Sequence, residues 1–331
     1  MSEGKATARA HPNIALVKYW GKRDARRILP HQSSFSVTLA PLEVVTTVQL
    51  GARANEVELN GQRAAGRERE RVLDLLAMVE QEAGRTLGPA RIVSRGNFPM
   101  AAGLASSAAG FAALARAARA AASLPDDAAA TSRLARTGSG SASRSVEGGF
   151  CTWHRGTRAD GRDSFASQDF PATHWPELRL LVCIVSPAEK EVSSRDGMQS
   201  TVDTSPYYAA WTTDAEAEVP RARAAAARRD LDGLGALSER NAWRMHAAAL
   251  AADPPLCYLR PATLGLLLAL PAARGRGLPV WFTLDAGPNP VLLTTASRLG
   301  EVEALAREHG AAEVVRCQPG GDASLLETHL F

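Results

Sequence analysis

The segment NFPMAAGLASSAAG, residues 97–110, constrains the fold more than any other part of the chain. It follows the β-rich stretch ARIVSRGNF, and an alanine-rich helix is expected to run from residue 104 to residue 122. Small residues let backbone N–H groups come close to a ligand, and the helix dipole favours an anion there. We therefore predict a phosphate-binding loop, to which Ser106 and Ser107 add hydroxyl groups. The alternative is an alanine-rich helix start at a tight packing point.

The cations for such a phosphate must come from another part of the chain. The loop does not match G-x-x-x-x-G-K-[ST] and no lysine follows it, so it is not a Walker loop. Of the 38 basic residues only four are lysines, and Lys18, Lys22 and Lys190 are the plausible suppliers. A lysine ammonium is a compact point charge, whereas arginine is planar. These lysines are interpreted either as phosphate ligands or as leftovers of an arginine-rich composition.

Two further segments are typical of anion-binding loops. TGSGSASRS, residues 137–145, alternates serine with glycine, and Arg144 in it offers a planar fork for phosphate. VSSRDGM, residues 192–198, places Ser194 and Arg195 just before a helix. Either segment alone is also explained as a serine-rich turn. Together with the isolated lysines they indicate two polyanionic ligands, a nucleotide and a phosphorylated substrate.

Asp285 stands where the apolar strand VWFTL breaks into the turn DAGPNP. An aspartate there either caps the turn or acts on a ligand from the end of a rigid strand. Beside phosphate loops, we interpret it as a base that takes a proton from a hydroxyl group. The histidines do not group, and His246 is interpreted as a packed or surface residue. With no H-E-x-x-H motif, a Mg²⁺ ion is expected to come with the nucleotide, held mostly by phosphates and water.

The composition excludes several classes of protein. Apolar residues make up 45 % and charged residues 22 %, an ordinary globular balance. No apolar run is long enough for a membrane helix, and MSEGKATARAHPN lacks the apolar region of a secretion signal. A net charge of +3 and 5 % aromatic residues disfavour a nucleic-acid partner. The four cysteines form no CxxC pair, so we expect a cytoplasmic protein with reduced thiols and no membrane or nucleic-acid partner.

Strands and helices are expected in two blocks, which predicts an α+β fold with a boundary near residues 186–192. The helix at 68–83 carries Val72, Leu75, Leu76 and Val79 on one face. Further helices are expected at about 126–137, 214–230, 230–250, 261–277 and 302–310. Strands are expected at 11–22, 33–52 (as two), 55–62, 90–98, 148–153, 178–186, 278–295 (as two) and 312–317. The strand at 178–186 is expected to close the first domain.

Seven segments, in this order, carry a family resemblance: NIALVKYWGKRD, LPHQSSFSVTL, NFPMAAGLASSAAGFAAL, ARTGSGSASRSVEGGF, VSSRDGMQSTVDTSPYYAAW, NAWRMHA and FTLDAGPN. Together they resemble the diphosphomevalonate decarboxylase family of the GHMP kinase superfamily, over about residues 11 to 295. The resemblance implies a two-domain GHMP-kinase-like fold with the active site in the cleft between the domains. The N-terminal domain would be residues 1–187, with the phosphate loop, and the C-terminal domain residues 188–331.

The resemblance also implies the reaction and the residues that carry it. The family uses ATP and Mg²⁺ to convert (R)-5-diphosphomevalonate into isopentenyl diphosphate, ADP, phosphate and CO₂. This reaction belongs to the mevalonate pathway of isoprenoid biosynthesis. The resemblance also leads us to expect a cytoplasmic enzyme that forms a homodimer. Asp285 would act on the 3-hydroxyl group and Lys18 would neutralise charge beside it. The implied substrate-binding residues are Tyr19, Lys22, Ser139, Gly140, Ser141, Arg144, Ser194, Arg195 and Met198. The implied ATP-binding residues are Asn97, Met100, Ala101, Ala102, Gly103, Leu104, Ala105, Ser106, Ser107, Ala108 and Lys190, and no protein-held metal site is implied.

Three positions depart from the family pattern. Ser143 replaces a frequent cysteine, Gln32 stands where asparagine often precedes two serines, and Pro290 replaces alanine or valine. None of these removes a residue expected to do chemistry. The alternatives are a kinase on the same scaffold or a decarboxylase of the monophosphate; a catalytically silent nucleotide-binding or protein-binding member and a nucleic-acid binder are less favoured.

Overall fold

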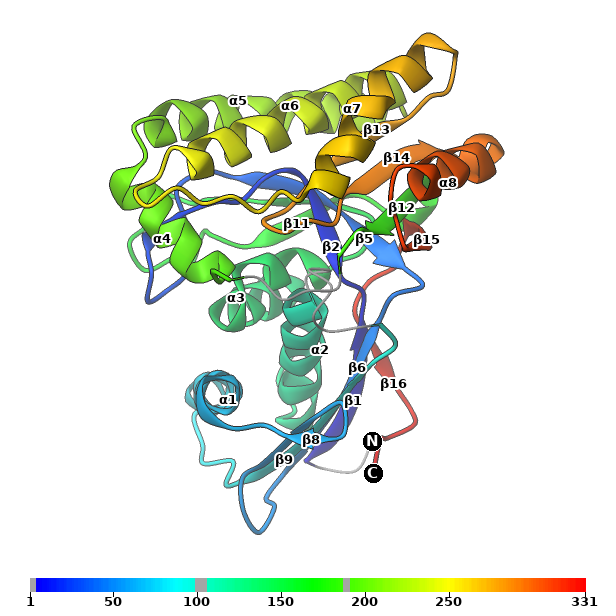
Figure 1. The fold of residues 1–331 in the computed structure, drawn as a ribbon. Coiled ribbons are helices and arrows are strands. Elements are labelled where there is room, and N and C mark those ends of the chain that lie inside the picture. Colours follow the sequence, from blue (N-terminus) through cyan, green and yellow to red (C-terminus); the bar gives the residue numbers. More distant parts are fainter. Residues whose placement is uncertain (1–3, 99–105, 187–190) are drawn as a thin grey trace.

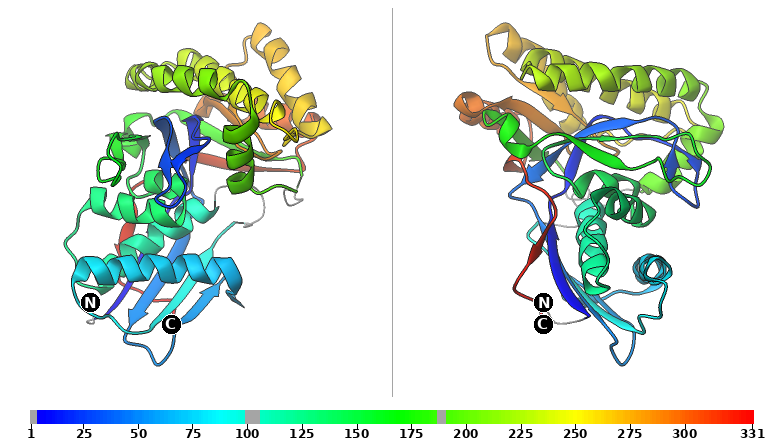
Figure 2. Two further views of the ribbon diagram at one scale, coloured as in Figure 1. Left: turned by 90° about the vertical axis from the view of Figure 1, so that its left-hand side faces the viewer. Right: turned by 180° about the vertical axis from the view of Figure 1, so that it is seen from behind.

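The computed structural model describes residues 4–98, 106–186 and 191–331, which form two large β-sheets covered by helices and one small two-stranded hairpin (Figure 1). Figure 2 shows the same arrangement from the side and from behind, with the smaller sheet at one end of the molecule. Within the described ranges, no helix has the length and apolar character needed to cross a membrane.

The smaller sheet has six strands in the order β16-β1-β6-β9-β7-β8. Its strands are β1 (Lys5–Ala10), β6 (Val44–Leu50), β7 (Glu56–Leu59), β8 (Gln62–Arg63), β9 (Ala90–Gly96) and β16 (Ser324–Leu326). The β7–β8 hairpin turns at Asn60 and Gly61, which both have positive φ (49° and 86°), as expected for an Asn-Gly turn. β16 pairs with β1, so a late segment of the chain completes a sheet begun at residue 5.

The larger sheet has eight strands, in the order β11-β10-β5-β15-β12-β14-β13 with β2 also paired to β5. These strands are β2 (Asn13–Val17), β5 (Ser34–Ala40), β10 (Phe150–Trp153), β11 (Ala166–Phe170), β12 (Leu178–Ile184), β13 (Trp281–Thr283), β14 (Val291–Thr295) and β15 (Glu313–Pro319); β3 (Lys22–Asp24) and β4 (Leu29–Pro30) form a separate hairpin. β12 buries both faces, because Leu180 and Val182 belong to one core cluster and Leu181 and Cys183 to another. This explains the unbroken apolar run from Leu180 to Ile184.

The helices cover both sheets. Their bounds are α1 (Gly66–Ala83), α2 (Ser106–Ala121), α3 (Ala128–Gly138), α4 (Ser194–Thr204), α5 (Tyr208–Ala227), α6 (Leu231–Leu250), α7 (Pro261–Gly275) and α8 (Leu299–Glu308), with short 3₁₀ turns η1 (Gly140–Ser145), η2 (Ala172–His174) and η3 (Ala296–Arg298). α2 packs on β1, β6 and β9, whereas α5 and α6 pack on β2 at the other end (Figure 1). α7 and α8 pack on β12, β13 and β14.

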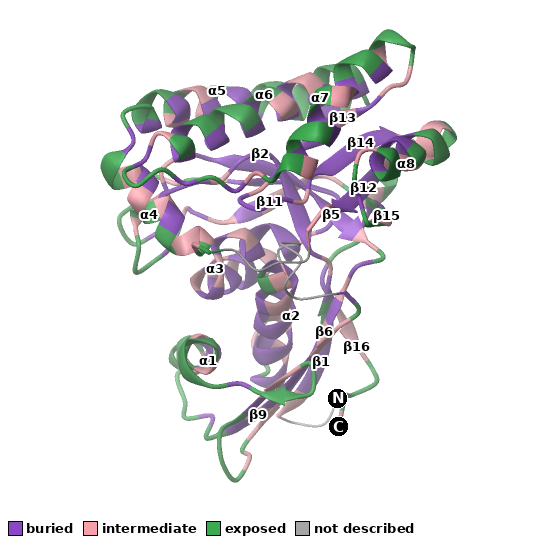
Figure 3. Ribbon diagram, viewed as in Figure 1, coloured by how far each residue is buried: buried purple, intermediate pink, exposed green. Residues whose placement is uncertain are grey.

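Two helices follow directly from their sequences. In α1 the four expected residues Val72, Leu75, Leu76 and Val79 are the buried ones. In α2 nearly every alanine is buried, and Figure 3 shows this helix as buried along most of its length. Alanine side chains let α2 lie close to the sheet, since they add little volume. The predicted helix at 104–122 is confirmed over the part that the structure describes.

Several strands were not expected from the sequence. They are β1, β11 and β16, together with the β3–β4 hairpin. β12 pairs on one side with β14 and on the other with β15, so both neighbours come from the C-terminal half of the chain. The proposed division of the chain at residues 187/188 stays a prediction.

Candidate active site

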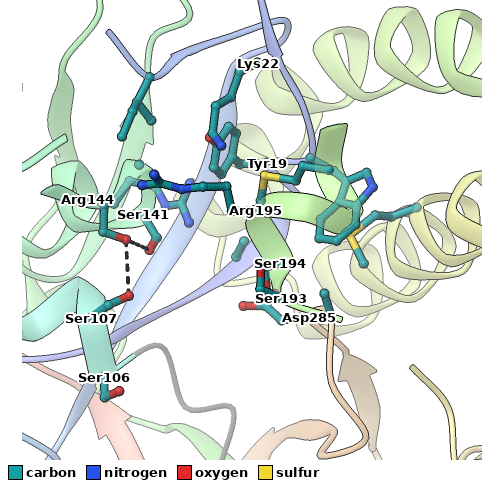
Figure 4. A pocket seen from close by; sticks show the side chains of 18 of the residues that line it. Tyr19, Lys22, Ser106, Ser107, Ser141, Arg144, Ser193, Ser194, Arg195 and Asp285 are labelled. Atoms are coloured by element: carbon teal, nitrogen blue, oxygen red, sulfur yellow. Dashed lines mark hydrogen bonds between the residues drawn. The ribbon is translucent and has the colours of Figure 1, made fainter. Parts of the chain in front are cut away.

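A cavity of about 430 Å³ lies where the end of β2, the start of α2, the η1 turn, the start of α4 and the loop after β13 meet. These elements come from distant parts of the sequence, and Figure 4 shows their labelled side chains around one space. The cavity is lined by Ala15, Tyr19, Trp20, Lys22, Ile28, Arg67, Arg71, Ser106, Ser107, Ser139, Gly140, Ser141, Arg144, Ser193, Ser194, Arg195, Met198, Met245, Asp285 and Ala286.

Lys18 and Asp285 form an ion pair at one end of this cavity. The Lys18 Nζ atom lies 2.6 Å from Asp285 Oδ1, with the Lys18 side chain 1 % exposed and that of Asp285 35 % exposed. Lys18 Nζ also donates to the carbonyl oxygen of Ala15 at 2.7 Å, and the same oxygen accepts from Thr283 Oγ1 at 2.7 Å. The pair is therefore fixed to β2 and β13 together. The carboxylate reaches the cavity while the ammonium stays behind it.

Burial and the neighbouring carboxylate shift the pKa of Lys18 in opposite directions. Burial lowers the pKa of its ammonium, and Asp285 opposes that shift by favouring the charged form. His246 on α6 is buried beside the pair, and burial lowers its pKa to about 4, so this imidazole is neutral at pH 7. His246 is thus a packed residue, in agreement with its interpretation from the sequence.

Arg144 in the η1 turn is a buried cation on the opposite wall. Its guanidinium donates from Nε to Asn13 Oδ1 at 3.1 Å and from Nη1 to Ser34 Oγ at 2.6 Å. Because both acceptors are neutral, the positive charge is not cancelled by them. Burial lowers the pKa of Arg144 to about 10, which leaves it charged at pH 7.

The ring of Tyr19 packs between the η1 turn and β10. Its centroid lies 4.7 Å from that of Trp153 in an edge-on arrangement. A Cβ atom at Gly140 would lie 2.8 Å from Tyr19 Cε1, so glycine is needed there for this close approach. The Tyr19 hydroxyl oxygen is buried and has no hydrogen-bond partner among the described residues. It lies in the wall of the cavity, where a ligand could satisfy it.

Four cations, Lys22, Arg67, Arg71 and Arg195, make up what we call the cationic wall of the cavity. Burial, together with repulsion from Arg195 and Arg67, lowers the pKa of Lys22 to about 8. Burial and the same two arginines lower the pKa of Arg71 to about 10. Among the described residues, none of the four cations forms an ion pair with a carboxylate. Such a wall favours a ligand with several negative charges.

Serine hydroxyls connect the α2 end of the cavity with the η1 turn. The Oγ atom of Ser139 lies 3.2 Å from that of Ser107 and 3.3 Å from that of Ser141, shown as dashed lines in Figure 4. Ser106 and Ser107 stand at the start of α2 as the structure describes it, and the N-terminal end of a helix favours an anion. Ser193 caps α4 by accepting from the Asp196 N–H group at 3.2 Å. Two helix starts thus face this cavity.

A second cavity of about 280 Å³ adjoins the first, with Arg71, Ser106 and Ser107 in both linings. Its other lining residues are Val44, Thr46, Leu59, Asn60, Glu68, Val72, Ile92, Ser94, Gly96, Gly110, Phe111 and Leu114. They come from the six-stranded sheet and from the faces of α1 and α2 that point to it. The mixture of aliphatic, aromatic and hydroxyl groups is suited to a flat ring with polar edges.

The structure brings most of the predicted site residues to one cavity. Those in its lining are Tyr19, Lys22, Ser106, Ser107, Ser139, Gly140, Ser141, Arg144, Ser194, Arg195, Met198 and Asp285, and Lys18 contacts Asp285. Ala108 is buried inside α2 and is in neither lining. Asn97 is exposed and hydrogen-bonded to the main chain at Glu43 and Pro41, so its role beside a nucleoside stays a prediction. The predictions for Met100, Ala101, Ala102, Gly103, Leu104, Ala105 and Lys190 lie outside the described residues.

Sequence reasoning missed Arg67 and Arg71 of the cationic wall. Both belong to the first turns of α1, whose sequence GRERERV is typical of any solvated helix face. Arg71 is held by a hydrogen bond from Nε to the carbonyl oxygen of Gly138 at 3.0 Å and lies over the ring of Phe111. No local signal distinguishes these arginines, because their role depends on where α1 packs.

Comparisons with known proteins identify the class. Residues 10–166 match the model of a diphosphomevalonate decarboxylase-like N-terminal domain, and residues 180–316 match that of a mevalonate 5-diphosphate decarboxylase C-terminal domain. The chain is 42 % identical to diphosphomevalonate decarboxylase mvd1 of Aspergillus fumigatus, over 87 % of this chain and 76 % of that one. It is 38 % identical to the human diphosphomevalonate decarboxylase, over 89 % of this chain and 78 % of that one.

Solved structures agree with these sequence relatives. Mevalonate diphosphate decarboxylase from Staphylococcus aureus has a TM-score of 0.92 and 34 % identity, covering 98 % of both chains. A structure described as MDDEF in complex with MVAPP, AMPPCP and magnesium has a TM-score of 0.90 and 40 % identity, covering 98 % of this chain and 99 % of that one. The chain therefore belongs to the diphosphomevalonate decarboxylase family, and its fold is the two-domain GHMP-kinase-like α+β fold. Both sequence predictions are confirmed.

Proposed function

We propose that this protein is an ATP-dependent diphosphomevalonate decarboxylase, which converts (R)-5-diphosphomevalonate into isopentenyl diphosphate with release of ADP, phosphate and CO₂. The observation that carries the proposal is the Lys18–Asp285 pair, which opens into a cavity whose other side is the cationic wall. A carboxylate that acts on a hydroxyl group and a surface that binds a polyanion are the two requirements of this reaction. The names of the relatives at 37–42 % identity agree with it.

The substrate would span the cavity from the cationic wall to Asp285. Its diphosphate carries several negative charges, and the four cations of the wall together with Arg144 supply the compensating positive charge. The hydroxyl groups near the η1 turn can donate to the remaining phosphate oxygens. The residues proposed to hold the substrate are Tyr19, Lys22, Ser139, Gly140, Ser141, Arg144, Ser194, Arg195 and Met198, joined by Arg67 and Arg71.

The nucleotide would lie across the start of α2. Backbone N–H groups and hydroxyls at Ser106 and Ser107 favour phosphate oxygens there, and the second cavity beside them has room for the nucleoside. This arrangement directs the triphosphate towards the first cavity, because the two cavities share Arg71 and these serines.

Mg²⁺ fits this site as a companion of the nucleotide. In the described ranges, no group of three or more His, Cys, Asp or Glu side chains could hold a metal ion. Mg²⁺ commonly keeps several waters and binds through substrate phosphates with one or two protein oxygens. Ser106 and Ser107, at the start of α2, would offer it hydroxyl oxygens beside the proposed phosphates. Bound there, the ion would neutralise phosphate charge.

Asp285 and Lys18 would perform the chemistry of the substrate hydroxyl. Asp285 orients the 3-hydroxyl group and accepts its proton as the oxygen attacks the γ-phosphate, and the Lys18 ammonium balances the negative charge that develops. The phosphate added to this tertiary oxygen is a good leaving group. As the C–O bond breaks, C3 becomes electron-poor, and the electron pair of the bond to the carboxylate carbon forms the alkene and releases CO₂.

The proposal is tested by measuring ADP and CO₂ with the mono- and diphosphate of mevalonate. We expect both products, in equal amounts, with the diphosphate and little of either with the monophosphate. ADP without CO₂ would show a kinase on the same scaffold, and preference for the monophosphate would show the alternative decarboxylase. Absence of both products with either substrate would favour a catalytically silent member.

We also infer that the protein is a homodimer in the cytoplasm. Closed two-fold dimers are the commonest oligomers of soluble proteins. In support, Leu268 on α7 is 73 % exposed and Leu264, one turn earlier, is 38 % exposed, so the two offer apolar surface that a second copy could cover. Sedimentation of the wild type and of Leu268→Glu tests the dimer. A wild type that sediments as a monomer at assay concentration contradicts it.

A further inference from the structure

Asn241 on α6 is fully buried and makes two side-chain hydrogen bonds in opposite directions. Its Oδ1 atom accepts from the backbone N–H group of Lys18 at 2.8 Å. Its Nδ2 atom donates to Glu218 Oε2 at 2.7 Å. Asn241 is in the lining of neither cavity, so its contacts are with the protein. A buried amide with both ends engaged has one favourable orientation.

Glu218 on α5 determines that orientation. Its carboxylate is 0 % exposed, and Oε1 accepts from Arg240 Nε at 2.8 Å and lies 3.5 Å from Arg244 Nη1. An ionised carboxylate accepts hydrogen bonds and donates none. It therefore requires the NH₂ end of Asn241 to face it, and the oxygen of Asn241 is left to face Lys18. The two arginines balance the buried charge of Glu218.

Lys18 depends on this arrangement because the rest of its main chain is held more weakly. Its carbonyl oxygen accepts from Gln32 Nε2 at 3.3 Å, a longer bond than the one from Asn241 to its N–H group. The side chain turns back so that Nζ reaches both Ala15 and Asp285. A displacement of the Lys18 main chain would therefore move the ammonium relative to the Asp285 carboxylate.

We propose that Glu218 and Asn241 are positioning residues, which hold Lys18 so that its ammonium stays at the Asp285 carboxylate, although neither touches a substrate. The proposal rests on the function proposed above for Lys18 and Asp285. It assigns a role in catalysis to the packing between α5 and α6, outside the cavity. Misplacing a catalytic group by about 1 Å can lower a rate about a hundredfold.

An exchange of the acid and the amide tests this role. Asn241→Asp replaces the fixed amide donor to Glu218 either by two mutually repelling carboxylates or by one proton shared between them, so we expect kcat to fall about 10- to 100-fold. KM for both substrates should change by less than about threefold, because the binding residues are untouched.

In the double variant Glu218→Gln/Asn241→Asp, the new amide on α5 can donate to the new carboxylate on α6, whose other oxygen again accepts from the Lys18 N–H group. We expect the double variant to recover at least about tenfold in kcat over Asn241→Asp, and Glu218→Gln completes the cycle.

Ser238→Ala is the matched control. Ser238 lies one turn earlier on α6 and is fully buried, and its hydroxyl has no hydrogen-bond partner among the described residues. We expect this variant to keep the wild-type kcat. The thermal midpoint of every variant is measured by circular dichroism, and kinetics are run well below the lowest midpoint. A loss of kcat in a fully folded variant then cannot come from unfolding.

Each outcome decides the proposal. A folded Asn241→Asp with wild-type kcat overturns it, and so does a double variant no faster than Asn241→Asp. If Asn241→Asp does not fold, Asn241→Ala replaces it, and its wild-type kcat would overturn the proposal equally. The wild type is assayed for ADP and CO₂ alongside: absence of both contradicts the proposed function itself, whereas normal wild-type turnover with unaffected variants contradicts the positioning role alone.

Discussion

The two ends of the cavity differ in how their cations are compensated. At one end the Lys18 ammonium is buried, paired with Asp285 at 2.6 Å and bound to the main chain of β2. At the other end the cationic wall of Lys22, Arg67, Arg71 and Arg195 stands beside solvent, and burial with repulsion from neighbouring arginines lowers the pKa values of Lys22, Arg71 and Arg195. The first arrangement holds a group in a fixed place. The second leaves charge that a bound polyanion can neutralise.

Under the proposed function, this contrast separates binding from chemistry within one cavity. A distant phosphate adds little electrostatic stabilisation to a cation that is already paired inside the protein. The same phosphate stabilises mutually repelling cations much more. Changes at the Lys18–Asp285 end should therefore alter kcat, and changes at the cationic wall should alter KM.

The largest effect is expected for Asp285→Asn. The amide keeps the shape of the side chain and loses the base, so kcat for ADP formation should fall about 10²- to 10⁴-fold. KM for diphosphomevalonate should change by a few-fold at most. A coupled ADP assay with parallel CO₂ trapping measures both. Near-normal ADP formation in this variant would show that Asp285 does not act on the hydroxyl group.

Arg195→Gln should have the next largest effect, on KM. Loss of a charge-assisted hydrogen bond of about 1.5–3 kcal/mol raises KM for the diphosphate about ten- to a hundredfold, with kcat nearly unchanged. Arg26→Gln, at an exposed arginine outside the cavity lining, is the matched control and should behave like the wild type. If Arg195→Gln lowers kcat instead, the separation of the two ends is wrong.

The pH dependence of kcat/KM should show whether the charge of Lys22 contributes to binding of the diphosphate. Burial, Arg195 and Arg67 lower its pKa to about 8 in the free protein. Below this pH the ammonium is charged and attracts the diphosphate; as pH rises through 8 it loses its proton, and kcat/KM should fall by up to about tenfold per unit. Lys22→Arg keeps its charge over this range and should flatten the fall. The same slope in wild type and variant would assign the titration to another group.

The smallest effect is expected for the dependence of KM on ionic strength. Between ionic strengths of about 0.01 and 0.1 M the Debye length shortens from about 30 to 10 Å, so KM for the diphosphate should rise a few-fold. The value of kcat should not follow, because the Lys18 side chain is buried. Steady-state kinetics in a KCl series with a fixed Mg²⁺ concentration provide the test. An equal response of kcat would mean that the pair is exposed to screening during turnover.

A structural element of this protein can be predicted from the sequence when neighbouring residues determine it, and not when distant residues do. The buried face of α1 and the alanine-rich α2 were predicted because periodicity alone determines them. β1 was missed because KATARA is rich in alanine, which has no preference for strands. It is a strand because β6 and β16 supply hydrogen bonds on both of its sides. Those partners come from residues 44–50 and 324–326, which a local pattern does not reveal.

The same distinction applies to the site. Asp285, Lys18 and the serine loops carry motifs, so their place at one site could be predicted from the sequence, whereas their roles came from a family resemblance and stay predictions. Arg71 carries no motif, since its place in the cavity depends on the packing of α1 against Gly138 and Phe111. Asn241 and Glu218 are similar: two ordinary polar residues in two helices, related by a hydrogen bond across 23 positions of sequence.

The pairing of late strands with early ones has a consequence for synthesis on the ribosome. A nascent chain that has reached about residue 300 already contains β1 and β5, but their partners β16 and β15 have not been made. The outer edge of β1 then offers unpaired N–H and C=O groups to any neighbouring chain. Stalled translation before residue 324 would therefore yield a product prone to aggregation, and the chain is most exposed to this risk while residues 300–326 are being made.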